Sequence, residues 1–217
     1  DGAATMSRVA VISRHQGREH RFDLTVMLPN GREGAVPTFL LVNNRPASNT
    51  DPTRMERSPF WPAEEVLARG YGIAALQVSE LAPDDDETFT EGVIRLFEGE
   101  GASRPDDAWM ALAAWGWGAS RALDYFETHE RIDSSRVAVV GHSRGGKAAL
   151  WAGAEDERFA MIVSNDSGEG GRLWRVATSA RPSSGSIPSS HTGLQPTTSG
   201  TTDVPVTCLS TSTCCWR

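Results

Sequence analysis

Several features that would classify this 217-residue chain are scarce or missing. Its three cysteines (Cys208, Cys214 and Cys215) all lie near the C-terminal end, so cysteine usage does not fix a redox compartment. No apolar run is long enough to span a bilayer, which argues against a membrane-spanning helix. The opening residues 1–5 are not a signal peptide, and we expect any export signal to have been removed or never included. What remains is an ordinary soluble composition, sufficient for one domain with a hydrophobic core.

Basic charge is also scarce. The formal net charge is −7 at pH 7. Residues 172–217 hold four arginines and one aspartate, so the acidic excess lies in residues 1–171. Binding to a phosphate backbone requires a basic surface. The charge therefore argues against a nucleic-acid partner.

Apolar strand patterns alternate with helical patterns along the chain. Buried strands are predicted at 36–42, 71–78, 137–140 and 159–163, and a half-buried strand at 21–28. Helices are predicted at 63–69, 105–129 and 147–154. Strands that are apolar on both faces, with helices between them, indicate a mainly parallel sheet covered on both sides. We therefore predict an α/β fold, a three-layer αβα sandwich.

The most informative stretch directly follows the strand at 137–140. Gly141-His-Ser143-Arg-Gly145 matches the pattern G-x-S-x-G, and an alanine-rich helix comes next. Strand, sharp turn and helix are the context of a nucleophile elbow in an α/β-hydrolase, where small residues flank the serine. A chance serine in a glycine-rich turn is the alternative. We predict that Ser143 is a nucleophile exposed at the edge of the sheet.

Two acidic stretches are candidate sites. Asp166 follows the strand at 159–163, and in an α/β-hydrolase the acid follows the nucleophile while the histidine comes last. Spacing leaves Asp166 with two interpretations, the acid of a triad or a turn residue before Ser-Gly. Residues 84–87 (Asp-Asp-Asp-Glu) lack the glycine and ligand spacing of a calcium loop, so we expect a solvated loop there rather than a metal site.

The helix predicted at 105–129 carries small and aromatic residues. Gly116 and Ala119 fall on its apolar stripe, where we expect them to let the helix lie close to the sheet. Trp115 and Trp117 fall outside the stripe. They could stack on sugars, but buried packing is the interpretation we favour.

Several motifs resemble one family. Residues 141–147 (GHSRGGK), 152–158 (AGAEDER) and 164–168 (SNDSG) are similar to the glucuronoyl esterases of carbohydrate esterase family 15, above all its bacterial branch. Residues 104–109 and 120–125 resemble that family too. The resemblance covers roughly residues 20–171. The arginine and the lysine after the serine make the elbow motif specific.

The resemblance implies a function and roles for particular residues. Its members cleave the ester between 4-O-methyl-glucuronic acid on xylan and lignin alcohols, with a serine nucleophile and without a metal or other cofactor. It implies that Ser143 attacks the ester carbonyl, Arg144 helps to hold the oxyanion, and Lys147 binds sugar hydroxyls. Asp166 stands where fungal members carry the acidic residue of the triad. The polymer substrate implies a secreted or periplasmic protein.

The pattern breaks after Gly171. Residues 172–217 contain 18 serines or threonines among 46 residues and show no periodicity, which is typical of a disordered tail. Moving the reading window one base earlier, with suitable synonymous codons, instead yields GGAALARR, HWF and LPVDQHMLLA, which continue the family pattern. We therefore predict a partial esterase domain at 1–171, truncated after the acid-bearing strand, and a frameshifted tail at 172–217. The sheet is expected to end at the strand 159–163.

The truncation bears on activity. The family's catalytic histidine lies further downstream, and we expect no histidine of this chain to replace it, His142 included, because it would point away from Ser143 across the elbow. The main hypothesis is a serine carbohydrate esterase whose present fragment is inactive. The alternatives are an acetyl-xylan or other esterase on the same fold, and a non-catalytic carbohydrate-binding remnant.

Overall fold

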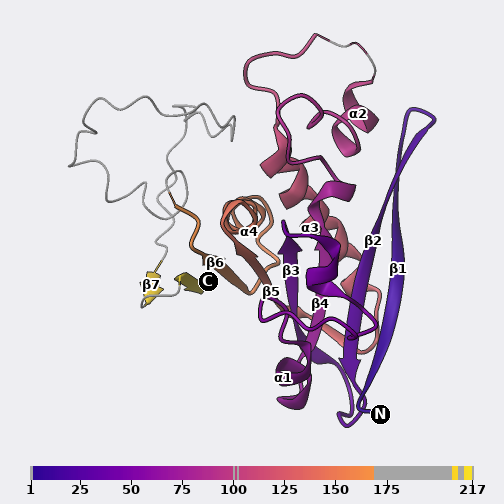
Figure 1. Cartoon of the computed structure of the whole chain (residues 1–217), viewed down its shortest axis with the longest axis vertical. Coiled ribbons are helices and arrows are strands. Elements are labelled where there is room, and N and C mark those ends of the chain that lie inside the picture. Colours follow the sequence, from indigo (N-terminus) through magenta and orange to yellow (C-terminus); the bar gives the residue numbers. More distant parts are fainter. Residues whose placement is uncertain (1, 100, 102, 169–206, 210–212, 217) are drawn as a thin grey trace.

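The computed structural model describes residues 2–99, 101, 103–168, 207–209 and 213–216. Within these residues the strands form one sheet in the order β1-β2-β4-β3-β5-β6-β8-β7 (Figure 1). The strands are β1 (Ala4–His15), β2 (Arg18–Pro29), β3 (Val36–Asn43), β4 (Gly72–Gln77), β5 (Ile132–His142), β6 (Met161–Asn165), β7 (Thr207–Leu209) and β8 (Thr213–Trp216). The helices are α1 (Ala63–Ala68), α2 (Val93–Glu98), α3 (Ala111–Glu127) and α4 (Arg144–Glu155), with short 3-10 turns η1 (Ala47–Thr50) and η2 (Val78–Glu80).

The middle of the sheet is parallel, as the sequence predicts. Strands β4, β3, β5 and β6 pair in parallel, while β1 and β2 form an antiparallel hairpin that joins the sheet through β4. The order β1-β2-β4-β3-β5-β6 is that of an α/β-hydrolase, which confirms the predicted fold class. A parallel sheet brings the carboxyl ends of its strands to one edge, and this edge is where α/β proteins build their sites.

Helices cover both faces of the sheet and complete the three layers. On β3, Leu40 and Val42 pack into the core beneath α2, α3 and α4, whereas Leu41 packs with α1 on the other face. On β4, Ala74 and Leu76 face the first core and Ile73 faces the second. Successive side chains of a strand alternate between faces, so these continuous apolar runs are buried on both sides.

The sheet extends beyond the strand at 159–163, where we predicted that it would end. β8 pairs antiparallel with β6, with Ile162 opposite Cys215, and β7 pairs with β8. The expectation that β6 forms the edge was therefore wrong. An edge strand presents unpaired N–H and C=O groups, and pairing with β8 satisfies those of β6. The rest of the predicted tail, 172–206 and 210–212, lies outside the described residues.

Helix α3 begins later than predicted, at Ala111 instead of Pro105. Residues 105–108 instead form a turn, in which the Ala108 amide donates to the Pro105 carbonyl at 3.1 Å. The guanidinium of Arg104 donates to the Trp109 carbonyl at 2.6 Å, which takes that oxygen out of a helical ladder. Proline marks a boundary here, but the helix proper starts only after this turn.

The small residues of α3 serve a different contact from the one expected. A Cβ added to Gly116 would lie 3.0 Å from Trp151 and 3.3 Å from the Ala152 amide, both on α4. Gly116 therefore brings α3 close to α4 rather than to the sheet, and the expectation for this residue was wrong. Trp115 is fully buried and its indole N–H donates to the Ala82 carbonyl at 2.9 Å, which confirms packing over sugar stacking for this residue.

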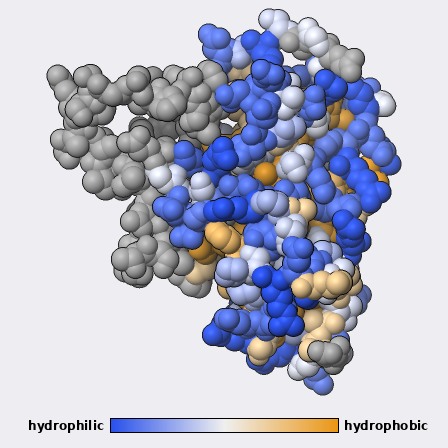
Figure 2. All heavy atoms as spheres, viewed as in Figure 1, coloured by the Kyte–Doolittle hydropathy of each residue, from blue (hydrophilic) through white to orange (hydrophobic). Residues whose placement is uncertain are grey.

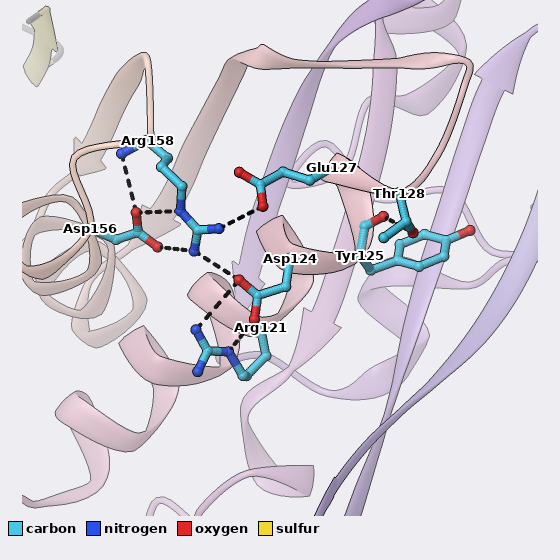
Figure 3. A network of polar contacts seen from close by, with 7 residues as sticks. All are labelled: Arg121, Asp124, Tyr125, Glu127, Thr128, Asp156 and Arg158. Carbon is cyan, nitrogen blue, oxygen red and sulfur yellow. Dashed lines mark hydrogen bonds and ion pairs between the residues drawn. The ribbon is translucent and has the colours of Figure 1, made fainter.

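The far end of α3 is fixed by a cluster of charges around one arginine (Figure 3). The Arg158 guanidinium contacts Asp156 at 2.7 Å, Asp124 at 2.9 Å and Glu127 at 3.0 Å. Asp124 and Glu127 belong to α3, whereas Asp156 follows α4, so the arginine joins the two helices. We call these four residues the Arg158 cluster.

The surface is mainly hydrophilic on the face shown in Figure 2, with apolar residues in small patches. The large exposed apolar side chains of the described residues are Met6, Ile12, Met55, Phe60, Tyr71 and Trp151. No helix in this part of the chain combines the length and apolar character that crossing a membrane requires.

Candidate active site

Ser143 occupies the turn between β5 and α4. Its backbone has φ 55° and ψ −121°, a conformation that residues with a side chain rarely adopt. The Ser143 amide donates to the Asn165 carbonyl at 2.9 Å, and its carbonyl accepts from the Lys147 amide at 3.1 Å. The strand, strained turn and helix predicted for a nucleophile elbow are therefore all present.

The two glycines of the motif are required by the tightness of this turn. A Cβ on Gly141 would lie 2.0 Å from the Gly145 carbonyl oxygen. A Cβ on Gly145 would lie 2.7 Å from the Val42 carbonyl oxygen at the end of β3. Both distances are far inside van der Waals contact. The pattern G-x-S-x-G is thus a packing requirement that presents Ser143 at the carboxyl ends of the parallel strands.

Arg144 has a partner that sequence reasoning missed. Its guanidinium Nη2 lies 2.8 Å from Oδ2 of Asp84, in the loop after η2. Residues 84–87 are all exposed, as expected of a solvated loop, but the first carboxylate is also paired with the residue after Ser143. Burial raises the pKa of Asp84, and the nearby Arg144 only partly opposes this rise. Across the described residues, no group of three or more histidine, cysteine, aspartate or glutamate side chains could hold a metal.

Lys147 lies one helical turn after Ser143 on α4 and is half-buried. Residues four apart on a helix share a face, so Lys147 and Ser143 can face the same space. The first turn of α4 packs tightly, since a Cβ on Gly146 would lie 3.0 Å from Ser164 Oγ on β6.

Asp166 follows β6 at the same edge as Ser143. The register of β5 and β6 pairs His142 with Asn165, so Ser143 and Asp166 are the next residues on neighbouring parallel strands. Asp166 is exposed and has φ 50°. Aspartate is among the few residues that tolerate this left-handed region in turns, so both interpretations, triad acid and turn residue, stay open.

The ring of His142 is engaged beside β6. It packs edge-on against Phe60, with ring centroids 5.0 Å apart, and its Nδ1 lies 3.2 Å from Nδ2 of Asn165. Elsewhere, His15 packs against Phe97 and His129 against Tyr125. His191 lies outside the described residues.

The loop after β3 also borders the elbow. A Cβ on Gly145 would come within 3.1 Å of Asn44 Oδ1, and the Arg45 guanidinium lies 4.5 Å from the centroid of the Phe60 ring. Phe60 in turn contacts His142, so an arginine and two rings line one side of the elbow. Sequence reasoning missed them because residues 43–60 show no periodic pattern. The only available signal was an aromatic pair in a polar loop, Phe60-Trp61, of which Phe60 is exposed and Trp61 is buried.

A cavity of about 650 Å³ lies away from these residues. It is lined by α1 and by residues just before β3 and β4, including Arg32 and Gly70. These are the amino ends of the parallel strands, opposite the edge that carries Ser143. We therefore assign this cavity to the packing of α1 and not to the candidate active site.

Comparisons with known proteins agree with the motifs. The sequence model of a family described as "Glucuronyl esterase, fungi" matches residues 11–197. A carbohydrate esterase from an unknown prokaryotic organism, MZ0003, is 44% identical over 112 residues, or 51% of this chain and 26% of that protein. A 4-O-methyl-glucuronoyl methylesterase of Phanerochaete carnosa is 37% identical over 111 residues, or 50% of this chain and 26% of that protein.

Solved structures extend the likeness to the fold. The glucuronoyl esterase from Solibacter usitatus superposes with a TM-score of 0.61 and 32% sequence identity. That match covers 77% of this chain and 53% of the other. The chain thus spans about a quarter of the length of the two curated relatives and about half of the solved one.

Proposed function

This chain belongs to the glucuronyl esterase family, and from that premise we propose that it is part of a serine esterase that cleaves esters of 4-O-methyl-glucuronic acid. The observation that carries the proposal is the strained elbow at Ser143, followed by Arg144 and Lys147 on the first turn of α4. Two relatives that match 50% and 49% of this chain are named 4-O-methyl-glucuronoyl methylesterases. The substrate is the ester that links glucuronoxylan to lignin alcohols, and the protein is secreted or periplasmic.

Each residue has a chemical task in the proposed reaction. Ser143 attacks the ester carbonyl, after a base has taken its proton, and a tetrahedral oxyanion forms. Arg144 stabilises that oxyanion with preorganised N–H donors, the main electrostatic contribution in such sites. Lys147 donates to sugar hydroxyls. No cofactor takes part.

The acid and the base complete the proposed triad. Asp166 is the candidate acid, since its strand neighbours that of Ser143. The base is the family's histidine, which lies further downstream than either reading frame of this chain. Residues 172–217 are proposed to be a frameshifted tail after a partial domain at 1–171. Sequencing the nucleic acid around the codon for Gly171 tests this directly, and an intact frame there would rule the frameshift out.

The experiment for the function uses a frame-restored gene. We expect the full protein to hydrolyse benzyl glucuronate faster than it deacetylates acetylated xylan, and both activities to vanish in Ser143→Ala. A preference for acetyl groups would instead make it an acetyl-xylan esterase on the same fold.

A second candidate function is a non-catalytic, carbohydrate-binding remnant. It is favoured by three of the histidines, whose rings contact other side chains: His142 with Phe60 and Asn165, His15 with Phe97 and His129 with Tyr125. Without a base, a serine and an acid retain only the residual effect of the oxyanion site and of binding. We expect the 217-residue chain to be inactive on benzyl glucuronate. Hydrolysis that disappears in Ser143→Ala would contradict that expectation.

A further inference from the structure

The ion pair between Asp84 and Arg144 joins two segments of the chain at the elbow. The two charged atoms lie 2.8 Å apart, and the side chains are 29% and 47% exposed, respectively. An arginine has five N–H donors, so one contact with a carboxylate leaves others available to a ligand. The pair therefore restrains the guanidinium without occupying it fully.

The backbone around Asp84 is anchored on both sides. Before it, Leu81 and Ala82 are fully buried, and the Ala82 carbonyl accepts the indole N–H of Trp115. After it, the Asp85 carboxylate accepts from the amides of Glu87 and Thr88, both at 3.0 Å. A residue fixed between two such anchors offers its carboxylate at a defined place. This is a built support and not a chance contact of two mobile side chains.

We propose that Asp84 is a positioning residue that holds the Arg144 guanidinium at the elbow and offsets its charge, so that the site prefers the neutral ester of a sugar acid to the free acid. This inference rests on the proposed function and adds to it a reason why the acid product would leave. Hydrolysis of a glucuronate ester releases a carboxylate at Ser143. An unpaired arginine would bind that carboxylate through a charge-assisted, bidentate contact.

Electrostatics supports this role. The charged neighbours of Asp84 are Arg144 on α4 and Asp86 in its own loop. Partial burial is the largest influence on Asp84 and raises its pKa, although the residue as a whole stays exposed to solvent. The carboxylate lies 2.8 Å from the guanidinium, close enough to reduce the attraction of Arg144 for an incoming anion.

The test measures binding, which requires no catalytic base, on the 217-residue chain. Calorimetry with glucuronate and with methyl glucuronate compares wild type, Asp84→Asn, Asp84→Glu and Asp86→Asn. We expect Asp84→Asn to bind glucuronate about fivefold more tightly, as for the loss of one partly exposed charge. Affinity for the neutral methyl ester should change less than twofold, and Asp84→Glu should restore the wild-type ratio.

Asp86→Asn is the matched control, because it removes one charge from the same loop. Equal tightening of glucuronate in Asp84→Asn and Asp86→Asn would overturn the proposal in favour of general charge repulsion. The Nε–H signal of Arg144 in NMR spectra, assigned by its loss in Arg144→Lys, tests the positioning separately. We expect it to shift or broaden in Asp84→Asn only, and an unchanged signal would overturn the positioning. If neither sugar binds any variant, the proposed sugar site and the ligand preference both fail, while the Arg144 signal still decides the positioning.

Discussion

Ser143 is held in a backbone conformation that its own Cβ disfavours. With φ 55° and ψ −121°, it lies outside the regions open to residues with a side chain. Such a conformation costs on the order of 1–3 kcal/mol and persists only where the surroundings impose it. Here the Asn165 carbonyl and the first turn of α4 impose it through hydrogen bonds. The strain should therefore be measurable in the stability of the chain.

Replacing Ser143 by glycine should relieve this strain. We expect Ser143→Gly to raise the free energy of unfolding by about 1 kcal/mol, because the gain exceeds the extra entropy of glycine in the unfolded chain. Ser143→Ala keeps the Cβ and should gain little. Urea unfolding of the two variants gives the comparison. Equal gains would attribute the effect to the lost hydroxyl and not to the backbone.

Replacing Gly141 by alanine should do the opposite. The new Cβ would meet the Gly145 carbonyl oxygen at 2.0 Å, so the turn must open. Overpacking typically costs about 1–3 kcal/mol, and a clash with backbone atoms should place this variant at the upper end of that range. Gly31→Ala is the control, since nothing lies within 4 Å of its added Cβ, and it should stay within about 0.5 kcal/mol. Similar losses in both variants, measured by urea unfolding, would show that the clash is not the cause.

From the sequence alone, only site residues that lie close together along the chain could be predicted. Ser143, Arg144 and Lys147 lie on one turn of chain whose glycine pattern has a physical reason, so they could be named in advance. Asp84 could not be paired with Arg144, because the contact depends on where the loop after β4 returns. The rings of Phe60 and His142 meet for the same kind of reason. No local sequence pattern predicts such contacts between segments that are far apart along the chain.

Among the elements, α3 and α4 depend on each other through the Arg158 cluster. The Arg158 side chain is 37% exposed, so solvent weakens each of its contacts, but three carboxylates share it. Hydrogen bonding from Arg158 is the main cause that lowers the pKa of Asp156. The same partners, Asp156 first, raise the pKa of Arg158. The cluster thus links helix packing to pH.

Acid should weaken the chain partly through this cluster. A carboxyl group whose pKa is lowered by folding adds stability above its unfolded pKa of about 4, and this stability is lost as the pH falls through the folded value. We expect Arg158→Gln to lower the free energy of unfolding by about 1 kcal/mol near pH 7. The gap from wild type should shrink below about pH 4. Urea unfolding across this pH range tests the prediction. A difference in the free energy of unfolding that stays constant with pH would show that Asp156 is not the cause.

Element prediction succeeded where burial sets the pattern. The buried strands β3 and β4 begin and end within about one residue of the predicted bounds, because both faces demand apolar side chains. Residues 132–135 belong to β5, since Ile132 pairs with Val36 before a bulge, so this strand begins earlier than the predicted 137–140. β1 and α2 were missed. β1 buries only one side, and α2 is a six-residue helix without a long apolar period.

For the whole molecule, the long edge strand β1 is the segment that most favours unwanted pairing with another chain. From Met6 onward its even-numbered residues face solvent, and among them Met6 is 46% and Ile12 43% exposed. Arg8 pairs with Asp23 and Arg14 with Glu19, which places charges along the strand. Charged side chains on an edge oppose pairing with another chain. Apolar residues beside them favour it.

Replacing the exposed apolar residues of β1 should weaken self-association of the chain. We expect the double variant Met6→Lys and Ile12→Lys to weaken self-association about tenfold, as judged from the apolar area lost. Met55→Lys is the control, because Met55 is 88% exposed but lies outside the sheet. Sedimentation velocity over a range of concentrations measures the effect. An equal effect in both variants would point to net charge instead of the edge.

The central place of β3 also determines when its neighbouring strands become available for pairing during synthesis on the ribosome. β3 ends at Asn43 and pairs on one side with β4, but its other neighbour, β5, ends only at His142. At synthesis rates of about 5–20 residues per second, roughly 5–20 s separate the two. During that interval the nascent chain exposes one apolar edge beside β3. A chaperone that binds apolar segments would therefore meet this protein early, before the elbow at Ser143 has been made.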